Sequence, residues 1–385
     1  MEEWKEYKIG DLFSHFKSGK GIKADEIYSS GKYPVFGGNG LRGYTNQNNF
    51  NGDCAIIGRQ GAFCGNVRYF KGKAYMTEHA IVAVANENNN TRFLAYLLGL
   101  MKLGRFSGQS AQPGLSVTEL TKQPIVVPSL STQKRIASIL SSLDDKIELN
   151  RRINENLEQQ AQALFKSWFI DFEPFKDGKF VDSELGMIPE GWKVIETNKF
   201  MTISKESINP SKNPNCFYAH YSIPAFDEKS MPIFQYGNEI KSNKQKVSDN
   251  MTLVSKLNPR IKRIWFIDKA CENAICSTEF IPYISLNNSP YFLYCYLDSD
   301  VFYNSIMSSV NGATGSHQRF QANDTLKFLF PYNDEVIYKF NLVVSGILKH
   351  KSRLIIESQK LSQLRDTLLP RLMSGKLEIK DNSYD

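Results

Sequence analysis

The sequence has no long apolar run, and this absence excludes the simplest membrane classes. No stretch approaches the ~18 consecutive apolar residues of a membrane-spanning helix, so we expect no membrane partner. The opening residues MEEWKEYKIGDLF are acidic and amphipathic, unlike the start of a signal peptide. We therefore expect a cytoplasmic protein.

Cysteine and histidine are scarce, which argues against a disulfide framework and a metal site. The chain has 6 cysteines, and none forms a C-x-x-C pair. They are Cys54, Cys64, Cys216, Cys271, Cys276 and Cys295. In a chain of this length we expect reduced thiols. The 5 histidines are scattered, without H-E-x-x-H or another paired ligand spacing, so we predict no metal site.

The sequence also lacks a complete nucleotide-binding motif. It has no P-loop, but YPVFGGNGLRGYT, from Tyr33 to Thr45, fits both F-x-G-x-G, the loop of S-adenosylmethionine methyltransferases, and the dinucleotide loop G-x-G-x-x-G. Such a loop needs a following helix whose N-terminus takes the phosphate. The next residues are rich in Asn and Gly and predict no helix. We interpret the stretch as a glycine turn and predict no cofactor for this chain.

What the chain does have is a mild positive charge and an internal repeat. Its net charge of +7 favours a polyanionic partner, although many ordinary proteins share that balance. Two long helical segments follow Pro128 and Pro331. The first carries a heptad seam from Ile136 to Trp168, which is typical of a coiled coil, and the second carries a weaker seam from Phe340. The residues alone allow either an intramolecular pair or a homodimer.

A strand-rich block precedes each long helix, and the two blocks share local echoes. MTEHAIVAVA in the first resembles STEFIPYISL in the second. The predicted fold class is α+β, with two mixed α/β domains, two long helices and a pseudo-twofold internal repeat. The predicted segments are a first domain at 1–128, a first long helix at 129–170, a linker at 171–191, a second domain at 192–332, a second long helix at 333–378 and a tail at 379–385.

Polar loops in both halves carry side chains that suit DNA. Arginine pairs with guanine, and asparagine or glutamine with adenine, in the major groove, whereas lysine suits phosphates. The alternative is that these side chains are merely solvated. The candidate DNA-binding residues of the first half are Arg42, Arg59, Gln60, Asn66, Arg68, Lys73, Arg105, Gln109 and Gln112. Those of the second half are Lys256, Asn258, Arg260, Lys262, His317, Gln318 and Arg319.

Several stretches together resemble the specificity subunit of type I restriction–modification systems over nearly the whole chain. They are WKEYKIGDLF, YPVFGGNGLRGY, TEHAIVA, the run from PIVVPSLSTQKRIASIL to FKSWF, GMIPEGWK and LSQLRDTLLPRLMSGKLEI. One departure from the family pattern is the second half's polar loop, SKLNPRIKR, which lacks the glycine-rich form GRQGAFCG of the first.

The resemblance implies a fold, a function and partners. Each domain would be a target recognition domain that reads one half of a split site in double-stranded DNA. The two long helices would pack antiparallel as a spacer. Two modification subunits would hold S-adenosylmethionine, and two motor-nuclease restriction subunits would use ATP and Mg. The chain would direct adenine methylation and restriction in phage defence without being an enzyme itself.

Two readings from other classes remain open. An autonomous DNA methyltransferase would need an N-P-P-Y-like loop, and the nearest match, NSPY from Asn288 to Tyr291, lacks the second-position proline. A coiled-coil scaffold without nucleic acid would explain the long helices but not the two loop-bearing blocks.

Overall fold

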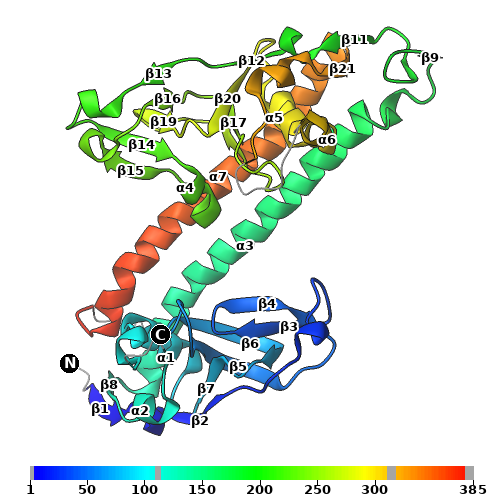
Figure 1. Cartoon of the computed structure of the whole chain (residues 1–385). Helices are drawn as coiled ribbons and strands as arrows, with labels where there is room; N and C mark the ends of the chain where they lie inside the picture. The colour runs from blue at the N-terminus through cyan, green and yellow to red at the C-terminus, as the bar shows by residue number, and fades with distance from the viewer. Residues whose placement is uncertain (1–3, 109–113, 310–317, 378–385) are drawn as a thin grey trace, which may run out of the picture. The chain divides into compact units, whose positions relative to one another are not determined.

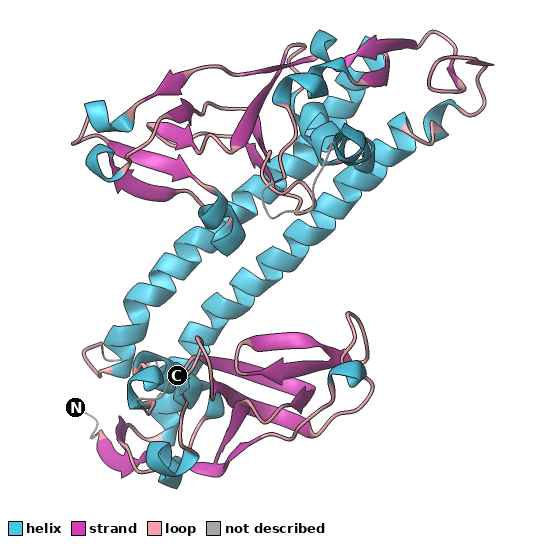
Figure 2. Cartoon of the chain, viewed as in Figure 1, coloured by secondary structure: helices cyan, strands magenta, loops and turns pink. Residues whose placement is uncertain are grey.

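The computed structural model describes residues 4–108, 114–309 and 318–377, except for the side chains of Lys229 and Ser309. The chain divides into two packing units (Figures 1 and 2). Unit 1 comprises residues 1–149 and 357–385, and unit 2 comprises residues 150–356. Each unit holds one globular block and a segment of each long helix. Because these units follow packing and divide both helices, the domain boundaries drawn from the sequence stay predictions.

The block of unit 1 is built on a six-stranded sheet with the order β2-β7-β5-β6-β3-β4. The strands are β2 (Phe13–Ser18), β3 (Tyr33–Gly37), β4 (Gly40–Thr45), β5 (Phe50–Gly58), β6 (Val67–Met76) and β7 (Ala80–Ala85). Neighbouring strands are antiparallel except β3 and β6, which run parallel. Helix α1 (Thr91–Leu100) packs on β5 and β6 (Figure 1) and buries Phe93, Leu94 and Leu98. Asn90 caps this helix by accepting a hydrogen bond from the Phe93 amide.

A short two-stranded sheet connects the block of unit 1 to the first long helix. Strand β1 (Lys5–Lys8) pairs antiparallel with β8 (Pro124–Val127), which follows the short helix α2 (Val117–Thr121). The first long helix, α3 (Leu130–Phe169), begins directly after β8 and Pro128. Proline favours an extended residue before it, so the strand ends there and a helix can start.

Unit 2 repeats this plan. Strand β11 (Lys193–Glu196) pairs with β21 (Leu329–Tyr332), and a four-stranded sheet has the order β12-β20-β17-β18. That order matches β2-β7-β5-β6, and β20 carries the echo of β7 that the sequence suggested. The strands are β12 (Met201–Ile203), β17 (Met251–Ser255), β18 (Ile264–Ile267) and β20 (Phe280–Ser285). Helices α5 (Pro290–Asp298) and α6 (Asp300–Ser309) follow β20, as α1 follows β7.

Unit 2 also has elements that unit 1 does not share in this order. A separate five-stranded sheet has the order β13-β16-β19-β14-β15. Its strands are β13 (Ser207–Ile208), β14 (Phe217–Tyr221), β15 (Ile233–Tyr236), β16 (Lys244–Lys246) and β19 (Ala274–Cys276), and helix α4 (Ile223–Lys229) follows β14. The predicted linker contains a small hairpin, β9 (Phe180–Val181) with β10 (Ile188–Pro189), beside an aromatic cluster around Trp192.

In unit 1, the segments of the two long helices run antiparallel. The second long helix, α7 (Asp334–Met373), has 40 residues, as α3 does. Asp144 accepts a hydrogen bond from Arg365 at 2.9 Å, and Lys146 lies 3.6 Å from Glu357. Residue numbers rise along α3 while those of their partners on α7 fall, so the two segments are antiparallel. The helix continues to Met373 in spite of Pro370.

In unit 2, the helix segments pack in the same sense around an aromatic core. The Phe165 ring lies 6.0 Å from the Phe340 ring, and Glu158 pairs with Lys351. Phe165 and Phe340 are fully buried. The long helices therefore pair within one chain, and the predicted fold class is confirmed.

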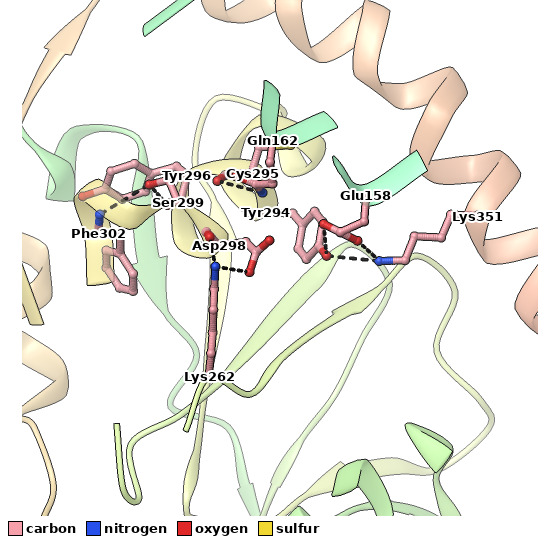
Figure 3. A network of polar contacts seen from close by, with 10 residues as sticks. All are labelled: Glu158, Gln162, Lys262, Tyr294, Cys295, Tyr296, Asp298, Ser299, Phe302 and Lys351. Atoms are coloured by element: carbon pink, nitrogen blue, oxygen red, sulfur yellow. Dashed lines mark hydrogen bonds and ion pairs between the residues drawn. The ribbon is translucent and has the colours of Figure 1, made fainter. Parts of the chain in front are cut away.

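Each unit ties its helices together with a tyrosine, a carboxylate and a cation. In unit 2, the Tyr294 hydroxyl of α5 donates to Glu158 of α3 at 2.7 Å, and Lys351 of α7 reaches both groups (Figure 3). Burial lowers the pKa of Lys351 to about 8. In unit 1, Tyr96 of α1 bonds Asp144 of α3, which also accepts from Arg365 of α7. A half-buried carboxylate with two donors fixes which turns of the helices meet.

No helix in the described part of the chain combines the length and the hydropathy that a membrane span requires. The six cysteines are all free thiols, as predicted. Within residues 4–108, 114–309 and 318–377, no group of three or more metal-ligating side chains gathers at one point.

Candidate nucleic-acid interface

The glycine-rich stretch of unit 1 is a tight turn between β3 and β4 that holds two arginines. A β-carbon on Gly37 would lie 2.7 Å from Cδ of Arg42, and one on Gly40 would lie 2.9 Å from Cζ of Arg68. Gly40 also has a φ of +95°, which side chains rarely adopt. The stretch continues into β4 instead of a helix, as expected, so it does not present a helix N-terminus to a phosphate.

The loop after β5 comes to the same end of the sheet. The Arg59 amide donates to the His79 carbonyl at 2.9 Å, and the Arg59 carbonyl accepts from Leu115 at 2.9 Å. A β-carbon on Gly38 would lie 3.2 Å from the Gln60 carbonyl oxygen, and the Gln60 side chain lies 2.9 Å from the His79 ring. The structure thus gathers four predicted residues around the turn. We call Arg42, Arg59, Gln60 and Arg68 the turn cluster.

Two other predicted residues, Asn66 and Arg105, line a pocket beside this cluster together with Arg68. The pocket has a volume of about 570 Å³ and lies between the start of β6 and the end of α1. We call it the corner pocket, lined by Cys64, Gly65, Asn66, Val67, Arg68, Gly99, Lys102, Gly104 and Arg105. Sequence reasoning missed Lys102; its place directly after a helix and three residues before Arg105 was the available signal.

Lys73 lies apart from the other predicted residues of unit 1. Strand β6 pairs with β5 without a bulge over the whole shared length. Because side chains alternate along a strand, Arg68 and Lys73 project from opposite faces. The structure therefore does not bring Lys73 to the turn cluster. Gln109 and Gln112 lie outside the described residues.

In unit 2, two loops bring several predicted residues together. Leu257 forms a β-bridge with Arg319, and the Asn258 amide donates to the Gln318 carbonyl at 2.9 Å. The Lys256 amide donates to the Glu279 carbonyl at 2.9 Å. Lys256, Asn258, Gln318 and Arg319 therefore lie close to one another. Arg260 is exposed in the same loop, and His317 lies outside the described residues.

Two predicted cations of unit 2 are held by carboxylates. Arg319 donates two hydrogen bonds to Glu279, at 3.0 and 3.1 Å, and this guanidinium lowers the pKa of Glu279. The Lys262 ammonium lies 2.8 Å from Asp298 (Figure 3). It also lies 5.2 Å from the centre of the Tyr303 ring. Burial raises the pKa of Asp298 although Lys262 opposes that shift. Sequence reasoning gave no hint of these partners, which lie 40 and 36 residues away in the chain.

Comparison with known proteins connects this architecture to one family. Residues 1–159 match the family model described as "Type I restriction modification DNA specificity domain". The EcoprrI type I restriction enzyme specificity subunit of Escherichia coli is 39% identical over 146 residues, which are 37% of this chain and 36% of that protein. The MjaIX specificity subunit of Methanocaldococcus jannaschii is 29% identical over 316 residues, which are 76% of this chain and 70% of that protein.

A solved structure extends the likeness of fold to almost the whole chain. The crystal structure of the type I restriction–modification S subunit from M. genitalium superposes with a TM-score of 0.65 and 18% identity. The superposition covers 98% of this chain and 97% of that one. At this level of identity the superposition shows a shared fold, which agrees with the family resemblance read from the sequence.

Proposed function

We propose that the chain belongs to the specificity-subunit family of type I restriction–modification systems and selects the DNA sequence on which partner subunits act. The likeness to specificity subunits implies that the chain itself would be non-catalytic. Two modification subunits would supply S-adenosylmethionine and methylate adenine. Two motor-nuclease restriction subunits would supply ATP-driven cleavage with Mg. This chain would supply the choice of site.

The observation that carries this proposal is the repeated block with diverged loops. The strand order β2-β7-β5-β6 of unit 1 recurs as β12-β20-β17-β18 in unit 2. The loops beside these strands differ, since one block presents the glycine turn and the other presents the loop around Asn258. Two globular blocks that share a strand order but differ in their loops would suit a split DNA site whose two halves differ in sequence.

In unit 1, the turn cluster has the chemistry for reading base edges. Arginine can bond guanine with two donors, and the amide of glutamine can bond adenine. Arg42, Arg59 and Arg68 form no ion pair among the described residues, so their donors stay available to DNA. In unit 2, Asn258 and Arg260 are the corresponding candidates.

The test is to coexpress the full chain with the modification subunit of its system and to map methylated adenines in the host genome. We expect a split motif, two short blocks around a fixed gap. Replacing residues 1–128 with the matching block of a relative should change only one half of that motif, which serves as the internal control. A continuous motif, or none from a complex that forms, would contradict the proposal.

A further inference from the structure

The corner pocket of unit 1 is lined by three cationic side chains and by no carboxylate. Arg68 comes from β6, whereas Lys102 and Arg105 come from the segment after α1. All three residues are exposed, and none has an ion-pair partner among the described residues. The volume of about 570 Å³ is of the size that binding sites for small groups have. Concave geometry, like charge and the absence of acids together favour an anionic ligand.

The pocket is a built feature of the fold and not a chance gathering of long side chains. A β-carbon on Gly65 would lie 2.1 Å from the Gly104 nitrogen, so the two segments that form the pocket touch through their backbones. Gly65 has a φ of +86°, and Lys102 has a φ of 51°. The Arg105 guanidinium lies 4.6 Å from the centre of the Phe106 ring, which restricts its position. Backbone contact thus fixes the two segments that carry the cations, and stacking restricts Arg105.

The matching corner of unit 2 holds an ion pair that neutralises its cation. In unit 2, β18 corresponds to β6 and α5 corresponds to α1. Lys262 lies just before β18, and Asp298 is the last residue of α5, so these two residues correspond to the residues around the corner pocket. Lys262 and Asp298 form an ion pair (Figure 3), and the ammonium lies 5.2 Å from the centre of the Tyr303 ring. The same fold can therefore fill this corner with a salt bridge, and unit 1 leaves its cations without one.

We infer that the corner pocket of unit 1 binds a phosphate group of the DNA backbone, so that it anchors the block without reading sequence. This inference rests on the proposed function. A phosphate oxyanion accepts several charge-assisted hydrogen bonds at once, which suits converging arginine and lysine donors. It reassigns Asn66 and Arg105 from base reading to backbone contact and adds Lys102 to the interface. Contacts of this kind set register and orientation but carry no base preference.

The test compares two double variants in the complex of the full chain with its modification subunit. The pocket variant is Lys102→Gln with Arg105→Gln, which spares Arg68 beside the glycine turn. The control is Lys17→Gln with Lys122→Gln, two exposed lysines of unit 1 on β2 and after α2, which removes the same charge elsewhere. Binding to cognate and to unrelated duplex DNA is measured over a series of salt concentrations.

We expect the pocket variant to bind both duplexes more weakly, with a slope of log affinity against log salt that is shallower by about 1 for each phosphate released. The methylated motif should stay the same, and the control should keep the wild-type slope. An unchanged slope in the pocket variant would overturn the inference. So would a changed base preference at one position of the motif, because that would mean base reading.

A second arm separates DNA from the other source of the same chemistry, a free nucleotide. Inorganic phosphate and adenosine monophosphate are titrated into the wild-type complex at constant ionic strength. If either ligand binds through Lys102 and Arg105 while the variant and the wild type have the same DNA affinity, the pocket binds a free anion and the inference that it binds a DNA phosphate is wrong. Failure of the proposed function would give a different result, because the wild type would then bind cognate and unrelated DNA equally. In that case the comparison of salt slopes on unrelated DNA would still show whether the corner pocket binds a phosphate.

Discussion

The two globular blocks share a strand order, yet their cations stand in different surroundings. In unit 1, Arg42, Arg59 and Arg68 have no acidic partner among the described residues. In unit 2, Arg319 is paired with Glu279 and Lys262 with Asp298. A duplicated scaffold has thus kept its strands while the charges on its loops diverged. Sequence counts of Arg and Lys therefore overstate what the second block can offer to DNA.

The cores of the two units differ as well. The helix segments of unit 2 meet through aromatic rings, since Phe165 lies within 5.2–6.5 Å of the rings of Phe169, Phe292, Tyr296, Phe330 and Phe340. In unit 1 the buried apolar helix positions are aliphatic, with Ile136, Ala137 and Leu140 beside Leu372 and Met373. The two ends of one pair of helices are thus stabilised by different side chains.

The largest effects we expect come from breaking these cores one at a time. Phe165→Ala should lower the free energy of unfolding by about 3–5 kcal/mol, and Leu140→Ala by about 2–5 kcal/mol, because both side chains are fully buried. Amide exchange should rise in α5 for the first variant and in α1 for the second. Leu149→Ala, at a half-exposed site of α3, is the control and should change stability by less than about 0.5 kcal/mol. Equal exchange changes in both helices from either variant would show that the units do not open separately.

A smaller effect should separate base reading in the two blocks. Arg59→Ala should cost about 1–3 kcal/mol of discrimination at one base pair, and only in the half-site that unit 1 reads. Arg260→Ala should do the same in the other half. The measurement is the methylated motif in the host genome together with affinity for single-substitution duplexes. Uniform weakening over all duplexes would instead assign these arginines to phosphates.

Much of the architecture could be predicted from the sequence because it rests on local patterns. The heptad seam, the glycine turn and the strand echoes depend on spacing along the chain, and each lies where expected. The site was only partly predictable, because a loop residue's role depends on neighbours distant in sequence. The sequence alone does not distinguish Arg319 and Lys262 from Arg59, since all three are cations in polar loops. Their carboxylate partners, Glu279 and Asp298, come close to them only in the folded chain. Lys73 does not join the other predicted residues for another reason, since side chains alternate along β6 and place it on the face opposite Arg68.

The smallest effect we expect would make unit 2 resemble unit 1. Glu279→Gln removes the carboxylate that holds Arg319, so this guanidinium gains freedom to meet a phosphate. DNA affinity of the complex should rise about three- to tenfold at low salt on any sequence, with a salt slope steeper by about 1. The control is Glu239→Gln, an exposed carboxylate elsewhere in unit 2.

Acidification should act on the wild type as the substitution does. Because Arg319 lowers the pKa of Glu279, the stabilisation from this pair is fully present above the ordinary carboxyl pKa. It is lost as the pH falls through the lowered pKa, where the carboxylate takes up a proton. The wild-type complex should therefore approach the slope of the Glu279→Gln variant only in strongly acidic buffer. If that variant instead binds DNA like the wild type at every salt concentration, Arg319 does not face DNA, and the pair with Glu279 only joins two loops.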